Sequence, residues 1–152
     1  MASTDEDDRC GVGIRGVAMA IDSGVWFALL FVAVYAVAAA TGQIETVANG
    51  TDANLEGGPA AAALALWLGL AVGYHTVCEW RFGGTIGKRL VRIRVESTDG
   101  SPLSLGASLL RNLARLVDWL PFGYALGIVV VLSSDEPQRL GDRLGGTVVV
   151  RR

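Results

Sequence analysis

One long apolar stretch, Gly11 to Thr41, limits what this chain can fold into. After Asp22 the chain carries no charged residue until Glu45, and a helix of that length crosses a hydrocarbon core about 30 Å thick. The stretch therefore predicts a membrane-spanning helix. Its first half nevertheless contains Arg15 and Asp22, and a charge at the centre of a bilayer costs at least about 2.5 kcal/mol. Both residues need partners.

The composition agrees with a membrane protein. The chain has 152 residues, of which 51% are hydrophobic and 18% are charged, so it is too short for two globular domains and too apolar for an ordinary soluble one. We expect one small integral membrane domain over residues 11–152, preceded by a disordered acidic tail over residues 1–10. The formal net charge of -2 argues against nucleic acid as a partner, because phosphate binding needs a basic surface.

A second span is predicted from Pro59 to Cys78, where the chain again lacks charges. Gly69 and Gly73 would let another helix approach closely, and Ala36 with Ala40 could do the same from the first span. The loop between the spans, residues 42–58, carries acidic residues but no Lys or Arg. The positive-inside rule therefore places this loop outside the cell.

The chain turns basic after the second span. The positive-inside rule assigns this flank to the cytoplasm, which predicts a multi-pass protein of the cell membrane with both termini in the cytoplasm. Its basic residues are Arg81, Lys88, Arg89, Arg92 and Arg94. We expect this cytoplasmic face to contact anionic lipid of the bilayer.

Two segments have strand character. Leu90 to Glu96 alternates apolar and charged residues, with Val91, Ile93 and Val95 on one face. The last residues, Thr147 to Arg152, include three consecutive valines. We expect the two segments to pair as a small two-stranded element on the cytoplasmic side.

A helix is predicted after Ser101-Pro102. Its apolar face is interrupted by Arg111, Arg115 and Asp118, which form one polar stripe. The stripe suits an interfacial helix with its arginines in the head-group region, or a buried helix that offers partners to the charges of the first span. Pro121 breaks the helix.

The apolar run after Pro121, residues 122–134, is short for a full span. If it crossed fully, the arginine-rich C-terminal tail would lie outside, against the charge rule. A Pro-broken helical hairpin that enters and leaves on the cytoplasmic side avoids this conflict. The expected fold is thus an all-α membrane bundle: two transmembrane helices, a re-entrant or amphipathic hairpin over residues 103–133, and the small β element.

Catalytic and cofactor signals are weak. Cys10, Cys78 and His75 do not form a metal-ligand set. The segment GTIGKR resembles a phosphate loop, but Phe82 stands where the first glycine is needed and Arg89 stands where Ser or Thr would hold magnesium. We therefore expect no enzyme, no bound metal and no cofactor.

Three segments, taken together and in order, resemble the RDD family of small membrane proteins, which is named for one arginine and two aspartates. The segments are RGVAMAID in the first helix, TIGKRLVRIRVESTDGSPLSLGASLLRNLARL over residues 85–116, and RLGDRLGGTVVV over residues 139–150. By position Arg15 and Asp22 match the first two family residues, and Asp142 fits the third better than Asp118 does. The resemblance implies an integral membrane protein. It implies little about activity: transport has been suggested for the family, and many members are accessory membrane domains.

Two functional hypotheses follow. In the first, the chain is an accessory, interaction or assembly module in which Arg15, Asp22 and Asp142 form a structural ion cluster; its partners are the bilayer and a second copy or another membrane protein. In the alternative, it transports a small ligand, or a cation coupled to protons, with Asp22 as the ion-binding carboxylate. In either case we expect Asp142 to pair with Arg15, and Arg111 or Arg115 to pair with the deeper Asp22.

Overall fold

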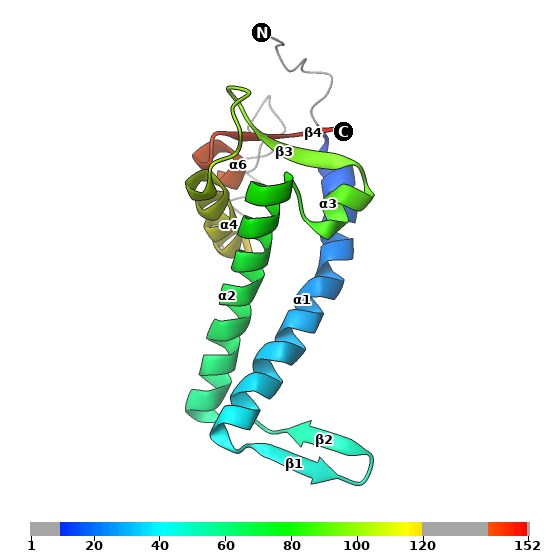
Figure 1. The fold of residues 1–152 in the computed structure, drawn as a ribbon, viewed down its shortest axis with the longest axis vertical. Helices are drawn as coiled ribbons and strands as arrows, with labels where there is room; N and C mark the ends of the chain where they lie inside the picture. The colour runs from blue at the N-terminus through cyan, green and yellow to red at the C-terminus, as the bar shows by residue number, and fades with distance from the viewer. Residues whose placement is uncertain (1–9, 120–139, 152) are drawn as a thin grey trace. The chain divides into compact units, whose positions relative to one another are not determined.

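The computed structural model describes residues 10–119 and 140–151 (Figure 1). It is mostly helical, with two short antiparallel strand pairs. Its elements in chain order are α1 (Val12–Thr41), β1 (Ile44–Val47), β2 (Gly50–Ala53), α2 (Gly57–Phe82), α3 (Ile86–Leu90), β3 (Ile93–Ser97), α4 (Leu105–Trp119), α6 (Leu140–Leu144) and β4 (Thr147–Arg151).

The two predicted spans are present as long helices. Within the described residues, α1 and α2 are long and apolar enough to cross a membrane, by length and composition. The first helix has nearly the predicted bounds: it was predicted from Gly11 to Thr41 and is observed from Val12 to Thr41. The second helix extends further than predicted, from Gly57 to Phe82, so it includes the charged residues Glu79 and Arg81. This extension matters for the site described below.

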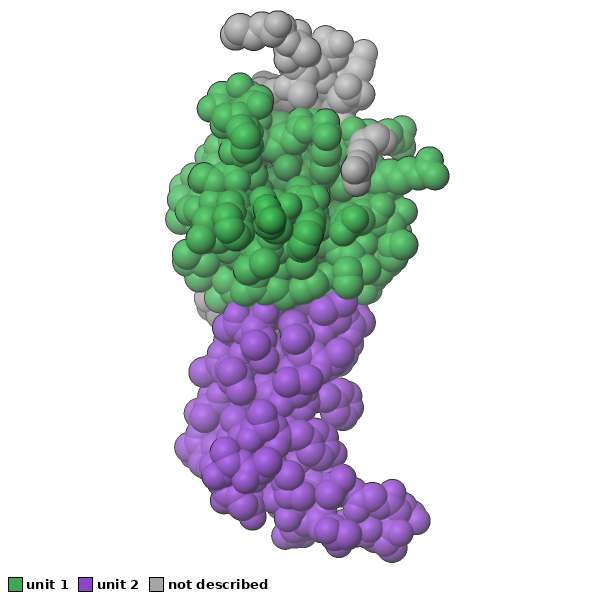
Figure 2. Space-filling view, viewed as in Figure 1, with its two compact units in different colours: residues 1–22, 72–152 green, residues 23–71 purple. Residues whose placement is uncertain are grey.

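The chain divides into two compact units, coloured separately in Figure 2. Unit 1 comprises residues 1–22 and 72–152, and unit 2 comprises residues 23–71. In unit 2 the two helices bury alanines at positions 33, 38, 63 and 71, and small side chains of this kind allow close helix approach. Ala36, Ala40 and Gly69, which we predicted for this role, are exposed instead.

Two tryptophans and a hairpin complete unit 2. The indole Nε1–H of Trp67 donates to the carbonyl oxygen of Trp26 at 2.9 Å, and the two rings meet edge to face at 5.8 Å. The loop between the two long helices contains the hairpin β1–β2, in which Val47 pairs with Gly50. The Tyr35 hydroxyl of α1 donates to the carbonyl oxygen of Thr51 at 3.1 Å. The hairpin was not predicted, because its strands are short and exposed and carry no apolar alternation.

Unit 1 contains the predicted strand pair. Strands β3 and β4 are antiparallel, with partners running from Ile93 and Arg151 to Ser97 and Thr147. The prediction of the pair is confirmed. The first strand begins at Ile93 rather than Leu90, because Leu90 still belongs to α3 and Arg92 adopts a left-handed turn with φ 57°.

The core of unit 1 forms against this strand pair. It consists of Cys10, Ala18, Ile93, Val95, Leu103 and Val149. Cys10 was assigned to the disordered tail; this is wrong, because Cys10 is buried and its N–H donates to the carbonyl oxygen of Val149 at 2.9 Å. The rest of the predicted tail, residues 1–9, lies outside the described residues.

The helix predicted after Ser101-Pro102 is present as α4, Leu105–Trp119. Helix α6 packs closely against α4. A Cβ atom at Gly141 would lie 2.8 Å from the carbonyl oxygen of Arg111, and one at Gly145 would lie 3.0 Å from that of Ala107. Only glycine therefore permits this approach of α6 to α4. The predicted return of a helical hairpin over residues 120–133, including Pro121, lies outside the described residues.

Candidate functional site

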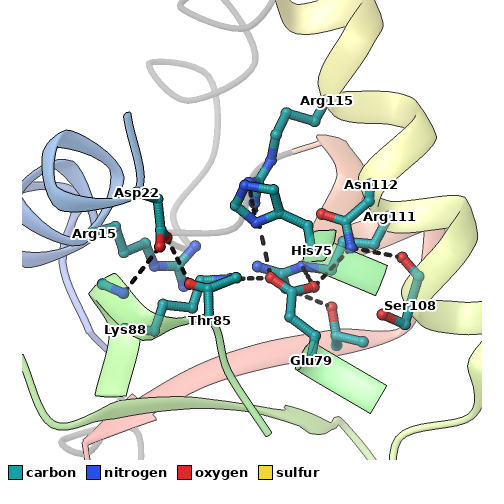
Figure 3. Close-up of polar contacts among 12 residues, drawn as sticks. Arg15, Asp22, His75, Glu79, Thr85, Lys88, Ser108, Arg111, Asn112 and Arg115 are labelled. Atoms are coloured by element: carbon teal, nitrogen blue, oxygen red, sulfur yellow. Dashed lines mark hydrogen bonds and ion pairs between the residues drawn. The ribbon is translucent and has the colours of Figure 1, made fainter. Parts of the chain in front are cut away.

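One face of α1 enters the core of unit 1. Arg15, Ala18 and Asp22 are all buried, with 7%, 1% and 2% of their surface exposed, and their spacing places them on one side of the helix. This face of α1 therefore lies against protein. Arg15 and Asp22 nevertheless have different partners: Arg15 pairs with Asp142, whereas Asp22 accepts a hydrogen bond from Thr85, as Figure 3 shows for the latter.

Asp22 accepts three hydrogen bonds, all from neutral donors. Its Oδ2 accepts from the Thr85 hydroxyl at 2.5 Å, and its Oδ1 accepts from the N–H of Gly87 at 2.9 Å and from the Tyr74 hydroxyl at 3.1 Å. The Tyr74 oxygen in turn accepts from the N–H of Ile86 at 3.0 Å. Asp22 and Tyr74 thus satisfy the backbone donors at the first turn of α3, which a helix cannot satisfy internally.

The expected pairing of Asp22 with Arg111 or Arg115 is therefore wrong. A carboxylate that receives several hydrogen bonds can be stabilised without an adjacent cation. Both arginines are engaged elsewhere, with the acidic residues Glu79 and Asp142. Asp22 fastens α1 to the start of α3.

Gly87 shows how closely these two elements approach. A Cβ atom at this position would lie 2.1 Å from the backbone oxygen of Ala18 and 2.9 Å from Cγ of Asp22. We expect Gly87→Ala to lower the free energy of unfolding by about 1–3 kcal/mol, as overpacking of a well-filled core does. Thermal unfolding of the purified protein in detergent measures the loss.

The matched control is Gly106→Ala. A Cβ atom at Gly106 meets nothing within 4 Å, so this substitution should leave the free energy of unfolding unchanged or slightly higher. Gly100→Ala is unsuitable as a control, because Gly100 has φ 74° and any side chain there strains the backbone. Equal effects of Gly87→Ala and Gly106→Ala would contradict the close approach.

A second polar cluster, here called the ion network, consists of Arg15, Glu79, Lys88, Arg111, Arg115 and Asp142. Nη1 of Arg15 lies 2.5 Å from Oδ2 of Asp142, and the other oxygen of Asp142 contacts Nη1 of Arg111. Asp142 therefore lies between two guanidinium groups. It joins α6 to both α1 and α4.

Glu79 is the second anion of the network, and its side chain has no exposed surface. It forms an ion pair with Lys88, and its oxygens lie 3.2 Å from Nε of Arg111 and 3.9 Å from Nη2 of Arg115. Asn112 adds a neutral hydrogen bond from Nδ2 to Oε2 at 2.9 Å. Glu79 therefore connects α2 to α3 and α4.

Neutral groups surround these ion pairs (Figure 3). Nη1 of Arg111 donates to the Thr147 hydroxyl at 3.0 Å, and Nη1 of Arg115 lies 2.9 Å from Nδ1 of His75. The Ser108 hydroxyl donates to the carbonyl oxygen of Thr76 at 2.9 Å. Buried charges are tolerated when ion pairs and further hydrogen bonds compensate their desolvation. The network meets this condition at both carboxylates, whereas Nε of Arg15, Nε of Arg111 and Oδ1 of Asn112 are buried without a hydrogen-bond partner in the described structure.

The balance of charge in the network is positive, with four cationic side chains and two carboxylates. Burial lowers the pKa of Lys88 to about 7; the Glu79 carboxylate opposes this shift, while the guanidinium groups of Arg111 and Arg115 add to it. Burial also disfavours charged Arg111, but the carboxylates of Glu79 and Asp142 more than offset this and raise its pKa. Of these two cations, Lys88 is therefore the one whose charged form burial disfavours more.

The structure brings most of the predicted site residues together. Arg15, Arg111, Arg115 and Asp142 belong to the ion network, whereas Asp22 lies with Thr85 and Gly87. The expected pair of Arg15 and Asp142 is present. The side chain of Asp118, the other candidate for the third family residue, lies outside the described part of the structure.

Sequence reasoning missed Glu79 and Lys88. A signal for Glu79 was present: it follows His75 by one helical turn at the end of an apolar run, and it precedes a segment that is otherwise basic. A single carboxylate in that position is a natural partner for several cations. Lys88 was considered as a phosphate ligand and as part of the basic cytoplasmic face, but not as a partner of a buried carboxylate.

In residues 10–119 and 140–151, no group of three or more His, Cys, Asp or Glu side chains could hold a metal ion.

Comparison with known proteins gives one match. The sequence model of the RDD family matches residues 9–146, which include Arg15, Asp22 and Asp142. No curated protein and no solved structure matches the chain.

Proposed function

This chain belongs to the RDD family of membrane proteins, and from that premise we propose that it is an assembly module rather than an enzyme. The observation that carries the proposal is that every described carboxylate of the predicted cluster is bound to a group of the protein. Asp22 caps α3, and Asp142 lies between Arg15 and Arg111. These charges fasten four helices and a strand pair into one rigid unit.

The proposed orientation rests on the distribution of basic residues. All 13 Lys and Arg residues of the sequence fall in residues 1–22 and 72–152, whereas residues 23–71 contain only acidic charges. The positive-inside rule then assigns unit 1 and both termini to the cytoplasmic side, and the loop with hairpin β1–β2 to the outside. In this orientation α1 and α2 cross the cell membrane. A second copy or another membrane protein is the proposed partner of the module.

The alternative, transport through Asp22, has weaker support. An ion that binds a buried carboxylate must replace the hydrogen bonds which that carboxylate already accepts. At Asp22 these come from Thr85, Gly87 and Tyr74, and one of them is a backbone N–H that would lose its partner. This arrangement favours a structural carboxylate over an exchange site.

Asp22→Asn separates the two functions. The amide keeps an oxygen for the Gly87 N–H, and its nitrogen can donate to the Thr85 hydroxyl, which rotates to accept. We expect the variant to fold with a loss of no more than about 1–2 kcal/mol in the free energy of unfolding, and we expect wild type and variant alike to show no cation flux above that of empty liposomes. Flux is measured with a pH-sensitive dye inside liposomes that contain the purified protein.

Two matched variants complete the design. Asp22→Ala removes both acceptor oxygens, and with them all three hydrogen bonds, so it should be less stable than Asp22→Asn. Asp99→Asn, in an exposed turn, should behave as wild type. If wild-type liposomes show pH-dependent cation flux that Asp22→Asn abolishes and Asp99→Asn retains, the protein is a transporter and the module proposal is rejected.

A further inference from the structure

Unit 1 contains a groove of about 380 Å³. Glu79 of the ion network belongs to its lining, where ion pairs with Lys88 and Arg111 balance the charge of this carboxylate. The walls of the groove are the last turn of α2, strand β3 and the turn that precedes α4. The volume falls within the range of about 300–1,000 Å³ that is typical of small-molecule sites. The side chains that matter here are Trp80, Phe82, Arg89, Arg94, Glu96 and Leu103.

The groove combines exposed aromatic rings with cations. Trp80 and Phe82 are 45% and 58% exposed, although they end a long apolar helix. Nearby on α3, Ile86 and Leu90 are 51% and 66% exposed. Exposed aromatic and aliphatic side chains at the end of a membrane helix are typical of the head-group region, where an apolar body and a polar edge are both accommodated.

The two arginines of the groove are available to an anion. The guanidinium of Arg89 lies over the Phe82 ring at 5.8 Å from its centroid, an arrangement that orients the cation without neutralising it. Nη2 of Arg94 lies 2.7 Å from Oε1 of Glu96, but these side chains are 49% and 27% exposed. An exposed pair of this kind contributes at most about 1 kcal/mol, so a stronger anion can displace the carboxylate.

We propose that this groove binds the phosphate head group of an anionic phospholipid from the surrounding bilayer. The phosphate contacts Arg89 and Arg94, which provide planar, charge-assisted hydrogen bonds, and the glycerol and upper acyl chains lie along Trp80 and Phe82. A lipid fits these observations better than a soluble phosphate does, because the cations are flanked by exposed apolar groups that a soluble ion would leave in water. The proposal rests on the proposed membrane orientation, in which the end of α2 lies at the cytoplasmic interface.

A bound lipid must be distinguished from general attraction to a charged surface. Such attraction is worth about 1 kcal/mol for any Lys or Arg near the bilayer, so it predicts the same effect at every arginine of this segment. Arg81 offers the matched control. It is exposed and lies between Trp80 and Phe82 in sequence, but it does not line the groove.

The test measures binding of phosphatidylglycerol and of phosphatidylcholine with the same acyl chains to the full-length protein in neutral detergent, by titration or by native mass spectrometry. We expect the wild type to prefer phosphatidylglycerol by about tenfold or more, corresponding to about 1.4 kcal/mol. Arg89→Gln and Arg94→Gln should each remove most of this preference, whereas Arg81→Gln should keep it. Glu96→Gln should strengthen phosphatidylglycerol binding, because it frees Arg94.

Three outcomes would overturn the proposal. Equal binding of the two lipids shows that the groove does not recognise the anionic head group. Equal losses in Arg81→Gln and Arg89→Gln show diffuse attraction. Displacement of the lipid by inorganic phosphate at matched ionic strength shows a soluble-anion site. None of these outcomes bears on the assembly module, whose ion network is tested separately by stability in neutral detergent without anionic lipid.

Discussion

Glu79→Gln should be among the most destabilising conservative substitutions in this protein. Gln has the shape of Glu but no charge, so Lys88, Arg111 and Arg115 would lose the buried carboxylate that they share. Breaking a buried ion pair by removing one partner typically costs about 3–5 kcal/mol, and here three cations are affected. We expect a loss in that range in the free energy of unfolding, measured by denaturation in neutral detergent.

A matched control for this experiment is Glu96→Gln. Glu96 pairs with Arg94 at 2.7 Å, but both side chains reach solvent, so this substitution should cost less than about 1 kcal/mol. If Glu79→Gln does not fold, the double variant Glu79→Gln with Lys88→Met provides the measurement. This double variant also removes the Lys88 cation that pairs with Glu79 and should recover part of the lost stability. Similar losses for Glu79→Gln and Glu96→Gln would show that Glu79 does not hold the network together.

The parts of the fold that could be predicted are those with a strong periodic or hydropathic signal. The length of α1 and the apolar run of α2 are evident in the sequence, because a helix in lipid must be apolar over its whole span. The pair β3–β4 could also be predicted, since Ile93 and Val95 alternate with charged residues and β4 is rich in valine. These signals depend only on neighbours in the chain.

The partners of Asp22 could not be predicted in the same way. Its donors are two hydroxyl groups and one backbone N–H, and neither kind of group leaves a charge pattern in the sequence. The search for cations therefore led to Arg111 and Arg115. Gly87 is the residue that permits this contact, because its lack of a side chain lets α3 approach Ala18 and Asp22. The sequence does not reveal this role, because a glycine near a helix start can also serve a turn or a cap.

Glu79 was missed for a different reason: the residue at which the second span ends was predicted wrongly. Placing the boundary of the second span at Cys78 made Glu79 the first residue of a solvated basic segment. The helix in fact continues to Phe82, which keeps Glu79 among the buried residues of unit 1. Helix boundaries are the least reliable part of a sequence-based prediction, and here an error of a single turn concealed the central anion of the network.

The pair of Arg15 and Asp142 should show strong and unequal effects when its members are replaced one at a time. Asp142→Asn removes the carboxylate that pairs with Arg15 and leaves Arg111 with Glu79 alone. Its expected cost is about 3–5 kcal/mol. Arg15→Gln should cost less, because Arg111 continues to neutralise Asp142. Thermal and chemical unfolding in neutral detergent would rank the two variants.

The double variant tests whether the two residues interact directly. If the ion pair at 2.5 Å stabilises the fold, the loss in the double variant should fall short of the sum of the single losses by about 0.5–3 kcal/mol. Arg15→Gln combined with Glu96→Gln is the control, since these two side chains share no ion-pair partner in the described structure, and its losses should add to within about 0.5 kcal/mol. Strict additivity would mean that Arg15 and Asp142 do not stabilise each other. Asp142 would then hold α6 to the rest of unit 1 through Arg111 of α4, and the assembly module would lack the proposed link between α1 and α6.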